Sequence, residues 1–462
     1  MSFRWKQHLP EIAIAAVALY FTYRELGSFP RSWFDEGLFI MIAKNVASGQ
    51  GYAIPLLDHF WYYPYFVAIG PTIILPAALS IKIFGPSVEA ARLPMTFYIL
   101  GSAILLYFFA WRIGGKANAR WSAALLVTLS AFVNTGKPVL GEIPGFFFLM
   151  LGFLAMTRVK RPVTRGIAGG LAFGLAILTK LPNALVLPAL GVAWIVALWR
   201  REWKEAASLT IGGVLAALIY VPWRWLEIVH TPVGSFVEEV NKFVLGGGDI
   251  PLMNVLRNNP ELLLRLPYLA FFVMLAAGLA GMWLAPSKAT RSVKLVVTTL
   301  TLLYFLYFVN SYGWYRHVLT AHLILIPFVP IGFARFFRKD IAAVLLSTIV
   351  VSQTIWQYTH QGSGNDAALA RAVEIIARDF RDTDLLIEES EVFAQLPENP
   401  RWLFLPRSTV APSMPEIYKT PNPAQRCFAH VRKLNEEETE AWKKRIVPVG
   451  SYAVVRPEFG CR

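Results

Sequence analysis

The sequence predicts a polytopic α-helical membrane protein with about eleven spanning helices and a small C-terminal α/β domain. Its 462 residues are 55% hydrophobic and only 16% charged, with a mean hydropathy of +0.47. Soluble proteins carry about 25% charged residues, so the composition excludes an ordinary soluble protein. The apolar residues gather in runs near the length of about 20 residues that crosses a bilayer as a helix. These runs end before Gln361, so we divide the chain into a membrane domain, 1–360, and a soluble domain, 361–462.

We place the spans from these runs and from the prolines and charges that bound them. The first run lacks a small-residue cleavage site, so we expect it to remain as a span and not to be removed as a signal peptide. The predicted spans are 10–26, 93–111, 119–135, 143–157, 166–180, 183–199, 206–223, 265–284, 293–310, 319–335 and 340–358.

The basic residues predict the orientation of these spans. The net charge is +14, but the tail from Gln361 holds 14 Lys and Arg against 15 Asp and Glu, so the excess lies in the membrane domain. Eighteen Lys and Arg residues fall on the N-terminal side of the membrane, against twelve on the other. Loops rich in Lys and Arg stay in the cytoplasm. We therefore expect a multi-pass protein of the cytoplasmic (inner) membrane, with the tail outside the cytoplasm and no nucleic-acid partner.

One apolar run, 65–84, is long enough to span but contains Pro71 and Pro76. Counting it as a span would place every later basic loop outside. We therefore interpret it as re-entrant or interfacial helices within a long first outer loop, 27–92. A second long outer loop is predicted at 222–265.

The tail alternates helix-like and strand-like segments, which predicts a small α/β domain outside the cytoplasm. Helices are expected at 367–380 and 436–445, and strands at 384–387, 402–405 and 453–456. The two cysteines, Cys427 and Cys461, both lie in this tail. A disulfide in an oxidising compartment and two unrelated free thiols are both compatible with that placement.

The first outer loop opens with an adjacent pair of acids, Asp35 and Glu36, followed by a helix-like stretch. Its apolar residues fall on one side and its polar residues on the other, which predicts a helix lying in the membrane interface. Asp35 is either the N-cap of this helix or a general base at the membrane edge. A partly dehydrated carboxylate has a raised pKa and can accept a proton from a hydroxyl or amine.

Other candidate site residues share the predicted outer face. Arginine binds phosphate bidentately, and a histidine beside an acid and aromatic residues can hold an anionic headgroup. Each candidate also has a structural interpretation: a core histidine, a salt bridge between Lys137 and Glu142, a snorkelling lysine or an interfacial arginine. The candidates are Asp58, His59, Tyr62, Lys137, Glu142, Lys180, Tyr315, Arg316 and His317.

Five segments carry a resemblance to a known family. They are FDEGLFIMIAKNVASGQGY, FGPSVEAARLP, GEIPGFFFL, LTKLPNALVLPAL and WYRH. In order and spacing the chain resembles the GT-C superfamily of polyprenyl-phosphate-dependent membrane glycosyltransferases, near the aminoarabinose transferase and protein O-mannosyltransferase branch. The resemblance covers about 1–340, and it covers the tail only as an appended outer domain.

The resemblance implies roles for particular residues. Asp35 matches the family's catalytic base, Glu36 its neighbour and Glu142 the second outer-loop acid. Arg316 matches a basic residue near the lipid phosphate, where His59, Lys137, Lys180 and His317 are further candidates. Asp58, Tyr62 and Tyr315 are candidates for the acceptor or sugar site. His59-Phe60-Trp61 departs from the family, in which a lysine followed by prolines is common.

The predicted function is inverting transfer of a sugar from a polyprenyl-phosphate donor to a lipid, glycan or protein acceptor. We expect a monomer in contact with membrane lipid and no required cofactor, although the acids could hold a divalent cation. The alternatives are a secondary transporter and a lipid-linked glycan flippase or polymerase. A transporter would carry its charges mid-membrane, often within inverted repeats, whereas these candidates gather at one face.

Overall fold

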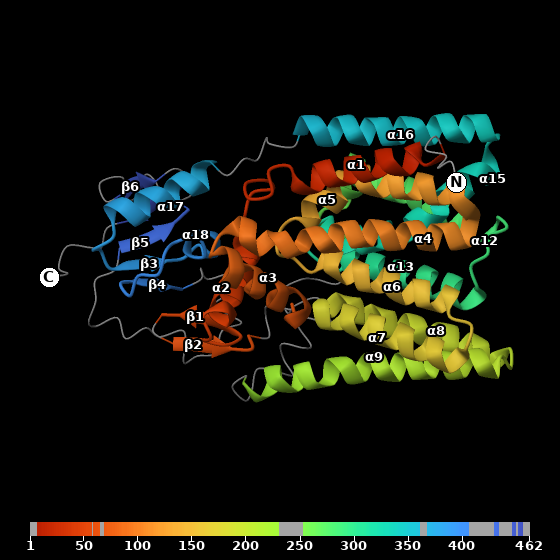
Figure 1. Cartoon of the computed structure of the whole chain (residues 1–462), viewed down its shortest axis with the longest axis horizontal. Coiled ribbons are helices and arrows are strands. Elements are labelled where there is room, and N and C mark those ends of the chain that lie inside the picture. The colour runs from red at the N-terminus through yellow and green to blue at the C-terminus, as the bar shows by residue number, and fades with distance from the viewer. Residues whose placement is uncertain are drawn as a thin grey trace, which may run out of the picture.

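A computed structural model describes residues 7–57, 59–64, 69–230, 253–360, 367–405, 429–433, 446–449 and 451–455. A long helical bundle forms one end of the molecule, and a small sheet domain forms the other (Figure 1). The first-loop elements lie between them. This arrangement confirms the predicted fold class.

The bundle contains every segment predicted to span the membrane. Its helices are α1 (Leu9–Tyr23), α4 (Val88–Thr128), α5 (Ser130–Gly136), α6 (Glu142–Arg158), α7 (Pro162–Thr179), α8 (Val186–Trp199), α9 (Trp203–Val229), α12 (Leu266–Trp283), α13 (Arg291–Val309), α14 (Arg316–Leu325), α15 (Val329–Phe336) and α16 (Lys339–His360). Short 3₁₀ turns, η3 (Leu181–Leu185) and η5 (Ile326–Phe328), join α7 to α8 and α14 to α15. Among the described helices, eight are long and apolar enough to cross a membrane.

That number is lower than the predicted eleven for two reasons. The predicted span 93–111 and most of the predicted span 119–135 lie in the single element α4, whose backbone turns at Gly115 with a φ of 84°. Only glycine adopts such a φ readily. In addition, α1 has 15 residues and α6 has 17, and both are shorter than a typical span.

The basic connections meet at one end of the bundle, as the charge pattern predicts. Glu11 of α1 accepts from Arg120 at 2.9 Å, and Glu205 of α9 pairs with Arg165 in the first turns of α7. The amide of Lys288 donates to the carbonyl of Ile113 at 2.9 Å. The connections counted as cytoplasmic therefore lie together.

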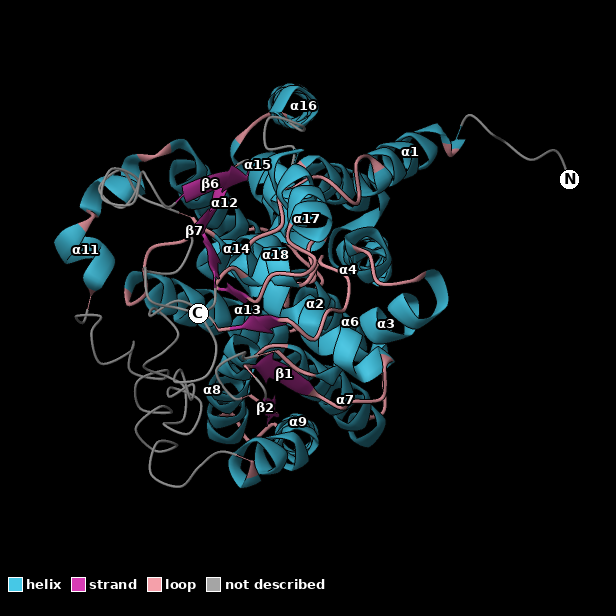
Figure 2. Ribbon diagram, turned by 90° about the vertical axis from the view of Figure 1, so that its left-hand side faces the viewer, coloured by secondary structure: helices cyan, strands magenta, loops and turns pink. Residues whose placement is uncertain are grey.

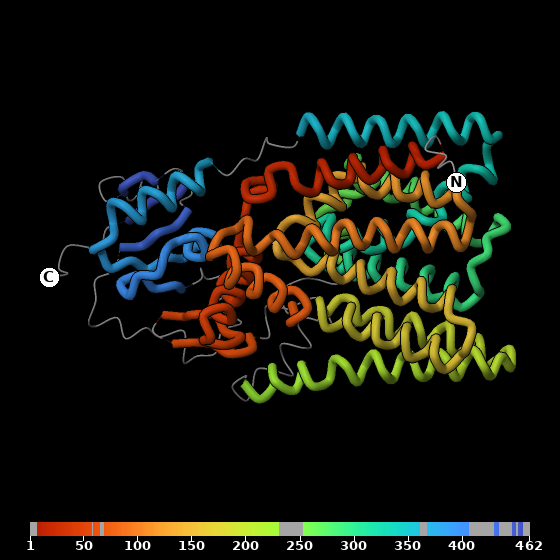
Figure 3. The backbone as a smooth tube through the Cα atoms, in the orientation of Figure 1, coloured from red at the N-terminus to blue at the C-terminus, as the bar shows by residue number. Residues whose placement is uncertain are grey.

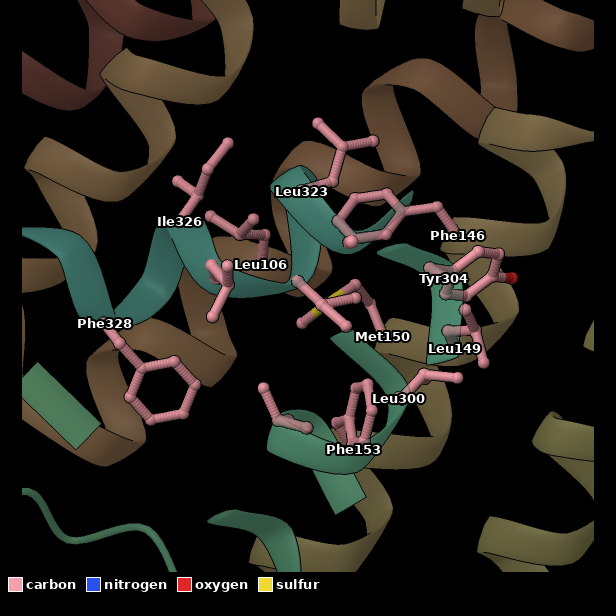
Figure 4. Close-up of a cluster of buried hydrophobic side chains, with 14 of the residues drawn as sticks. Leu106, Phe146, Leu149, Met150, Phe153, Leu300, Tyr304, Leu323, Ile326 and Phe328 are labelled. Atoms are coloured by element: carbon pink, nitrogen blue, oxygen red, sulfur yellow. The ribbon is translucent and has the colours of Figure 1, made fainter. Parts of the chain in front are cut away.

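A large apolar cluster holds the bundle together. Side chains from α4, α6, α13 and α14 interdigitate within it, with Leu106, Met150, Phe153 and Leu300 fully or almost fully buried (Figure 4). Between helices in lipid this packing acts through van der Waals contact and not through loss of water. Tyr304 lies in the same cluster with its hydroxyl at the edge (Figure 4).

The first outer loop folds into compact elements at the opposite end. They are α2 (Phe34–Ala47), the hairpin of β1 (Ala53–Leu56) and β2 (His59–Tyr62), and α3 (Pro71–Phe84). With 14 residues, α3 is shorter than a span. It packs against α2, α4 and α7, which agrees with an interfacial helix in this loop.

The second outer loop begins later than predicted. Helix α9 continues through Pro222 to Val229, so the first residues of the predicted loop 222–265 are helical. A helix can continue past proline when neighbouring groups satisfy the freed carbonyl. The described chain resumes with α11 (Asn254–Asn258) and η4 (Pro260–Leu264), and the intervening part of this loop lies outside the described residues.

The small domain has a five-stranded sheet in the order β4-β3-β5-β7-β6. Strand β3 is parallel to β4 and β5, while β7 is antiparallel to β5 and β6. Its elements are α17 (Ala367–Asp379), β3 (Leu385–Ile387), α18 (Ser390–Phe393), β4 (Trp402–Phe404), β5 (Ala429–Arg432), β6 (Ile446–Val449) and β7 (Tyr452–Val455). The first predicted helix and all three predicted strands are confirmed. The predicted helix 436–445, Cys427 and Cys461 lie outside the described residues.

Helix α2 differs from its predicted environment. It lies between the bundle and the small domain (Figures 1 and 3), and all of its residues from Glu36 to Ala43 are buried. The polar side contacts protein: Lys44 donates to the carbonyls of Ala394 and Leu396, and Asn45 donates to that of Ala53. The predicted helix is therefore confirmed as an element of the first outer loop, but its polar side contacts the small domain instead of water.

Candidate active site

Asp35 lies in the first turn of α2 and points toward the bundle. The N-cap of α2 is Trp33, and no side chain caps the helix, so the capping interpretation of Asp35 is wrong. Asp35 accepts a hydrogen bond from Arg316 with an Oδ2–Nη1 distance of 2.6 Å. Its side chain is 34% exposed. A reacting group could therefore reach this carboxylate.

Arg316 is the first residue of α14 and is held by aromatic rings. Its guanidinium carbon lies 4.4 Å from the ring centres of both Trp33 and Trp314. Such cation–π contacts fix the plane of the guanidinium. Its Nε is buried without a hydrogen-bond partner. One donor of a well-oriented arginine is thus available to a ligand.

Arg316 lines a small pocket together with residues of α6 and α13. Glu142, the first residue of α6, lines it and pairs with Lys180 at 2.6 Å between Oε1 and Nζ. The other oxygen, Oε2, is buried without a partner. Two residues that line the pocket, Glu142 and Arg316, thus each have a buried polar atom without a hydrogen-bond partner.

Polar side chains of three further elements complete the pocket wall. The hydroxyl of Tyr304 donates to Asn183 at 2.7 Å, and His317 shares a hydrogen bond with Ser311 at 2.7 Å. The remaining lining residues are Pro182, Tyr307 and Thr320. The sequence prediction missed Asn183, Tyr304, Tyr307 and Thr320. Asn183 had a usable signal, because it follows Lys180 within the same short LTKLPN segment, whereas the tyrosines lie inside an apolar span.

Glu36 is not part of this pocket. It forms a bidentate ion pair with Arg92, at 2.7 Å and 2.6 Å, and both side chains are 0% exposed. The amide of Val139 donates to the same carboxylate, and Arg92 also donates to the carbonyls of Leu26 and Pro30. Glu36 is therefore a buried structural anchor, and its position gives no support to its predicted catalytic role.

Lys137 also lies away from the pocket. It is fully buried, and its amine donates to the carbonyl of Arg24 at 2.6 Å. The predicted alternative of a Lys137–Glu142 salt bridge is wrong, because Glu142 pairs with Lys180. The phosphate role considered for Lys137 gains no support from its contacts.

The remaining candidates lie elsewhere or outside the described residues. His59 and Tyr62 lie at the two ends of β2 in the hairpin, which borders β4 of the small domain and not the pocket. Tyr315 hydrogen-bonds His322 within the bundle. Asp58 lies outside the described residues. The structure thus brings together Asp35, Glu142, Lys180, Arg316 and His317 from the predicted set.

Burial of Lys137 gives a prediction on stability. Desolvation, with the nearby Arg92 charge, lowers the pKa of Lys137 from 10.5 to about 7. Between about pH 7 and 10.5 the unfolded chain then binds a proton that the folded chain does not, so Lys137 makes the free energy of unfolding rise with pH. We expect Lys137→Met to remove this contribution. Thermal unfolding in detergent at pH 7 and pH 9.5 measures it, and an unchanged pH dependence in the variant would contradict the assignment.

The helical bundle, the first-loop helices and the appended sheet domain are the parts of the GT-C fold, and comparisons with known proteins agree with this fold. Residues 75–232 match the family of dolichyl-phosphate-mannose-protein mannosyltransferases. A 150-residue stretch is 31% identical to undecaprenyl phosphate-alpha-4-amino-4-deoxy-L-arabinose arabinosyl transferase 1 of Sodalis glossinidius, covering 30% of this chain and 26% of that protein. The corresponding transferase of an Enterobacter species is 27% identical over 204 residues, or 41% and 35% of the two chains. The matched region thus spans about a quarter to a third of these relatives.

Solved structures extend the similarity to the whole chain. ArnT from Cupriavidus metallidurans bound to undecaprenyl phosphate superposes with a TM-score of 0.69 and 14% identity, covering 97% of this chain and 98% of that one. The oligosaccharyltransferase AglB from Archaeoglobus fulgidus, in complex with an inhibitory peptide and a dolichol-phosphate, gives 0.66 and 11% identity, covering 100% and 75%. The chain therefore has the GT-C fold, which it shares with these two proteins.

Proposed function

We propose that the protein is a membrane glycosyltransferase that moves a sugar from a polyprenyl-phosphate donor to a lipid, glycan or protein acceptor. The observation that carries this proposal is the pair of Asp35 with Arg316, an arginine that lines the polar pocket. It sets a partly exposed carboxylate beside a cation suited to phosphate. The names of the relatives, which are undecaprenyl phosphate sugar transferases, support the same donor class.

The proposed reaction is a single displacement with inversion. Asp35 accepts the proton of an acceptor hydroxyl or amine, whose lone pair attacks the anomeric carbon. The bond between that carbon and the phosphate oxygen breaks, and the lipid phosphate leaves with the electron pair. Arg316 and Lys180 stabilise its growing negative charge. These two cations supply the charge compensation, so we expect no divalent cation to be required.

The unsatisfied atoms of the pocket fit the polar head of such a donor. A phosphoryl oxygen can accept from Nε of Arg316, and a sugar hydroxyl can donate to Oε2 of Glu142. Leaving either protein atom buried and unpaired costs about 1–3 kcal/mol, which a ligand with both kinds of group recovers. Glu142 accordingly orients the sugar by accepting a hydrogen bond, and it does not take a proton from the acceptor.

The site lies at the end of the bundle opposite the basic connections. With the basic end in the cytoplasm, as the charge asymmetry indicates, the site and the small domain face outward across the inner membrane. Charges gathered at one end also favour an enzyme over a secondary transporter, whose charges lie near the bilayer midplane. A lipid-linked sugar in the outer leaflet could reach a site in this position.

The test is turnover of a labelled polyprenyl-phosphate sugar by the purified protein. We expect release of free lipid phosphate together with labelling of an acceptor. Arg316→Lys keeps the charge but loses the stacking and the fork geometry, so it should weaken transfer by roughly 10- to 100-fold, the equivalent of one charged hydrogen bond. Arg257→Lys, at an exposed arginine of α11, is the matched control. Donor binding without turnover would contradict the proposed transferase activity and favour a flippase.

A further inference from the structure

The small domain rests directly on the backbone of α2. Helix α18 crosses α2 where the two domains meet (Figures 1 and 2). A Cβ atom at Gly37 would lie 2.4 Å from the amide nitrogen of Glu391 and equally close to the carbonyl carbon of Ser390. Real Cβ atoms do not approach backbone so closely. The contact therefore requires glycine two residues after Asp35.

Hydrogen bonds fix the same junction on both sides of Asp35. The hydroxyl of Ser390 donates to the carbonyl of Phe34 at 2.5 Å, and Ser390 is fully buried. Glu36 is held from the other direction by Arg92. The residues before and after Asp35 are thus fixed by different parts of the protein, Phe34 by the small domain and Glu36 by the bundle.

Further contacts extend the junction along α2 and the loop before it. Lys44, near the C-terminal end of α2, donates to the carbonyls of Ala394 and Leu396, which lie within three residues after the end of α18. Arg31 donates to the hydroxyl of Tyr452 at 3.1 Å, and that hydroxyl donates to Glu391. The small domain therefore contacts the residues leading into α2, its first turn and its last turn.

We propose that the small domain positions the catalytic base: α18 presses on α2 at Gly37 and, with Ser390, holds Asp35 against Arg316. Gly37 and Ser390 are positioning residues that do not touch substrate. The inference rests on the proposed glycosyl transfer and adds a role for the small domain in it. A reacting group must be held to about 0.5 Å, and a displacement of about 1 Å can cost 10²-fold in rate.

The test compares Gly37→Ala and Ser390→Ala with Gly191→Ala, a helical glycine of α8 with nothing within 4 Å of an added Cβ. We expect Gly37→Ala to lower kcat by roughly 100-fold with the donor KM changed only a few-fold. Ser390→Ala should act in the same direction, more weakly. Hydrogen–deuterium exchange of α2 amides, which requires no transfer, should rise in both variants. The control should match the wild type in all three measurements.

The outcomes separate the two proposals. Wild-type transfer with normal kcat in both variants would overturn the positioning role alone. So would a lost kcat with unchanged exchange in α2. If Gly37→Ala does not fold, Ser390→Ala decides, because it removes an interaction without adding atoms. A wild type without transfer, despite slow α2 exchange, would overturn the proposed function and with it this inference.

Discussion

Replacing Asp35 with asparagine is expected to lower sugar transfer by about 10²- to 10⁴-fold, the usual contribution of a general base. Asparagine keeps the size and one acceptor oxygen, so it can still meet Nη1 of Arg316. It cannot take the acceptor's proton. We therefore expect donor binding to survive while kcat falls. Donor binding by equilibrium titration and transfer by acceptor labelling measure the two effects separately.

Glu89→Gln provides the control for Asp35→Asn. Glu89 lies in the first turn of α4, exposed, at the same end of the bundle, and outside the pocket lining. Losing its charge should leave transfer within a few-fold of wild type. Near-normal transfer by Asp35→Asn would show that Asp35 is not the general base. An equal loss in both variants would indicate a general effect of charge at this surface.

The features predicted best are those that depend on local sequence patterns. Runs of apolar residues located the helices, and the basic loops showed which connections share an end. Once the topology was assigned, Asp35, Glu142, Lys180 and Arg316 had to lie near one face. Their direct contacts, such as the Asp35–Arg316 pair across 281 positions, follow from tertiary packing alone.

Partner choice among charged residues could not be read from the sequence. Glu142 has Lys137 five positions away, yet it pairs with Lys180, because the α5–α6 turn directs Lys137 toward the carbonyl of Arg24. Glu36 looked equivalent to Asp35 as its neighbour. Successive helical residues point about 100° apart, so one acid faces Arg316 and the other faces Arg92.

The environment of α2 was unpredictable for a related reason. An amphipathic pattern predicts a face that avoids water and a face that tolerates polar neighbours. It does not distinguish water or lipid headgroups from the carbonyls of another domain. Lys44 contacts such carbonyls, which belong to residues more than 300 positions away in the sequence. The small domain thus converts an apparent interfacial helix into a buried support for the site.

Breaking the Glu36–Arg92 pair is expected to produce the largest loss of stability. Removing one partner of a buried ion pair costs about 3–5 kcal/mol, because the other charge stays buried without compensation. Arg92→Met keeps the length of the side chain but leaves Glu36 with the Val139 amide as its one remaining partner among those described above. We expect a clear drop in the thermal unfolding temperature in detergent. Arg378→Met is the control, since its pair with Asp379 is exposed and water screens the attraction of such surface pairs.

The double variant Glu36→Leu/Arg92→Met distinguishes two causes of the lost stability, namely an unpaired buried charge and altered packing. Buried ion pairs replaced by apolar residues of similar volume are often neutral or stabilising. We therefore expect the double variant to unfold at a higher temperature than Arg92→Met alone. Its transfer activity should nevertheless stay low, because the pair also fixes the residue next to Asp35 and joins α2 to α4. A double variant as unstable as the single one would mean that the carbonyls of Leu26 and Pro30, which lose their Arg92 donor in both, dominate the cost.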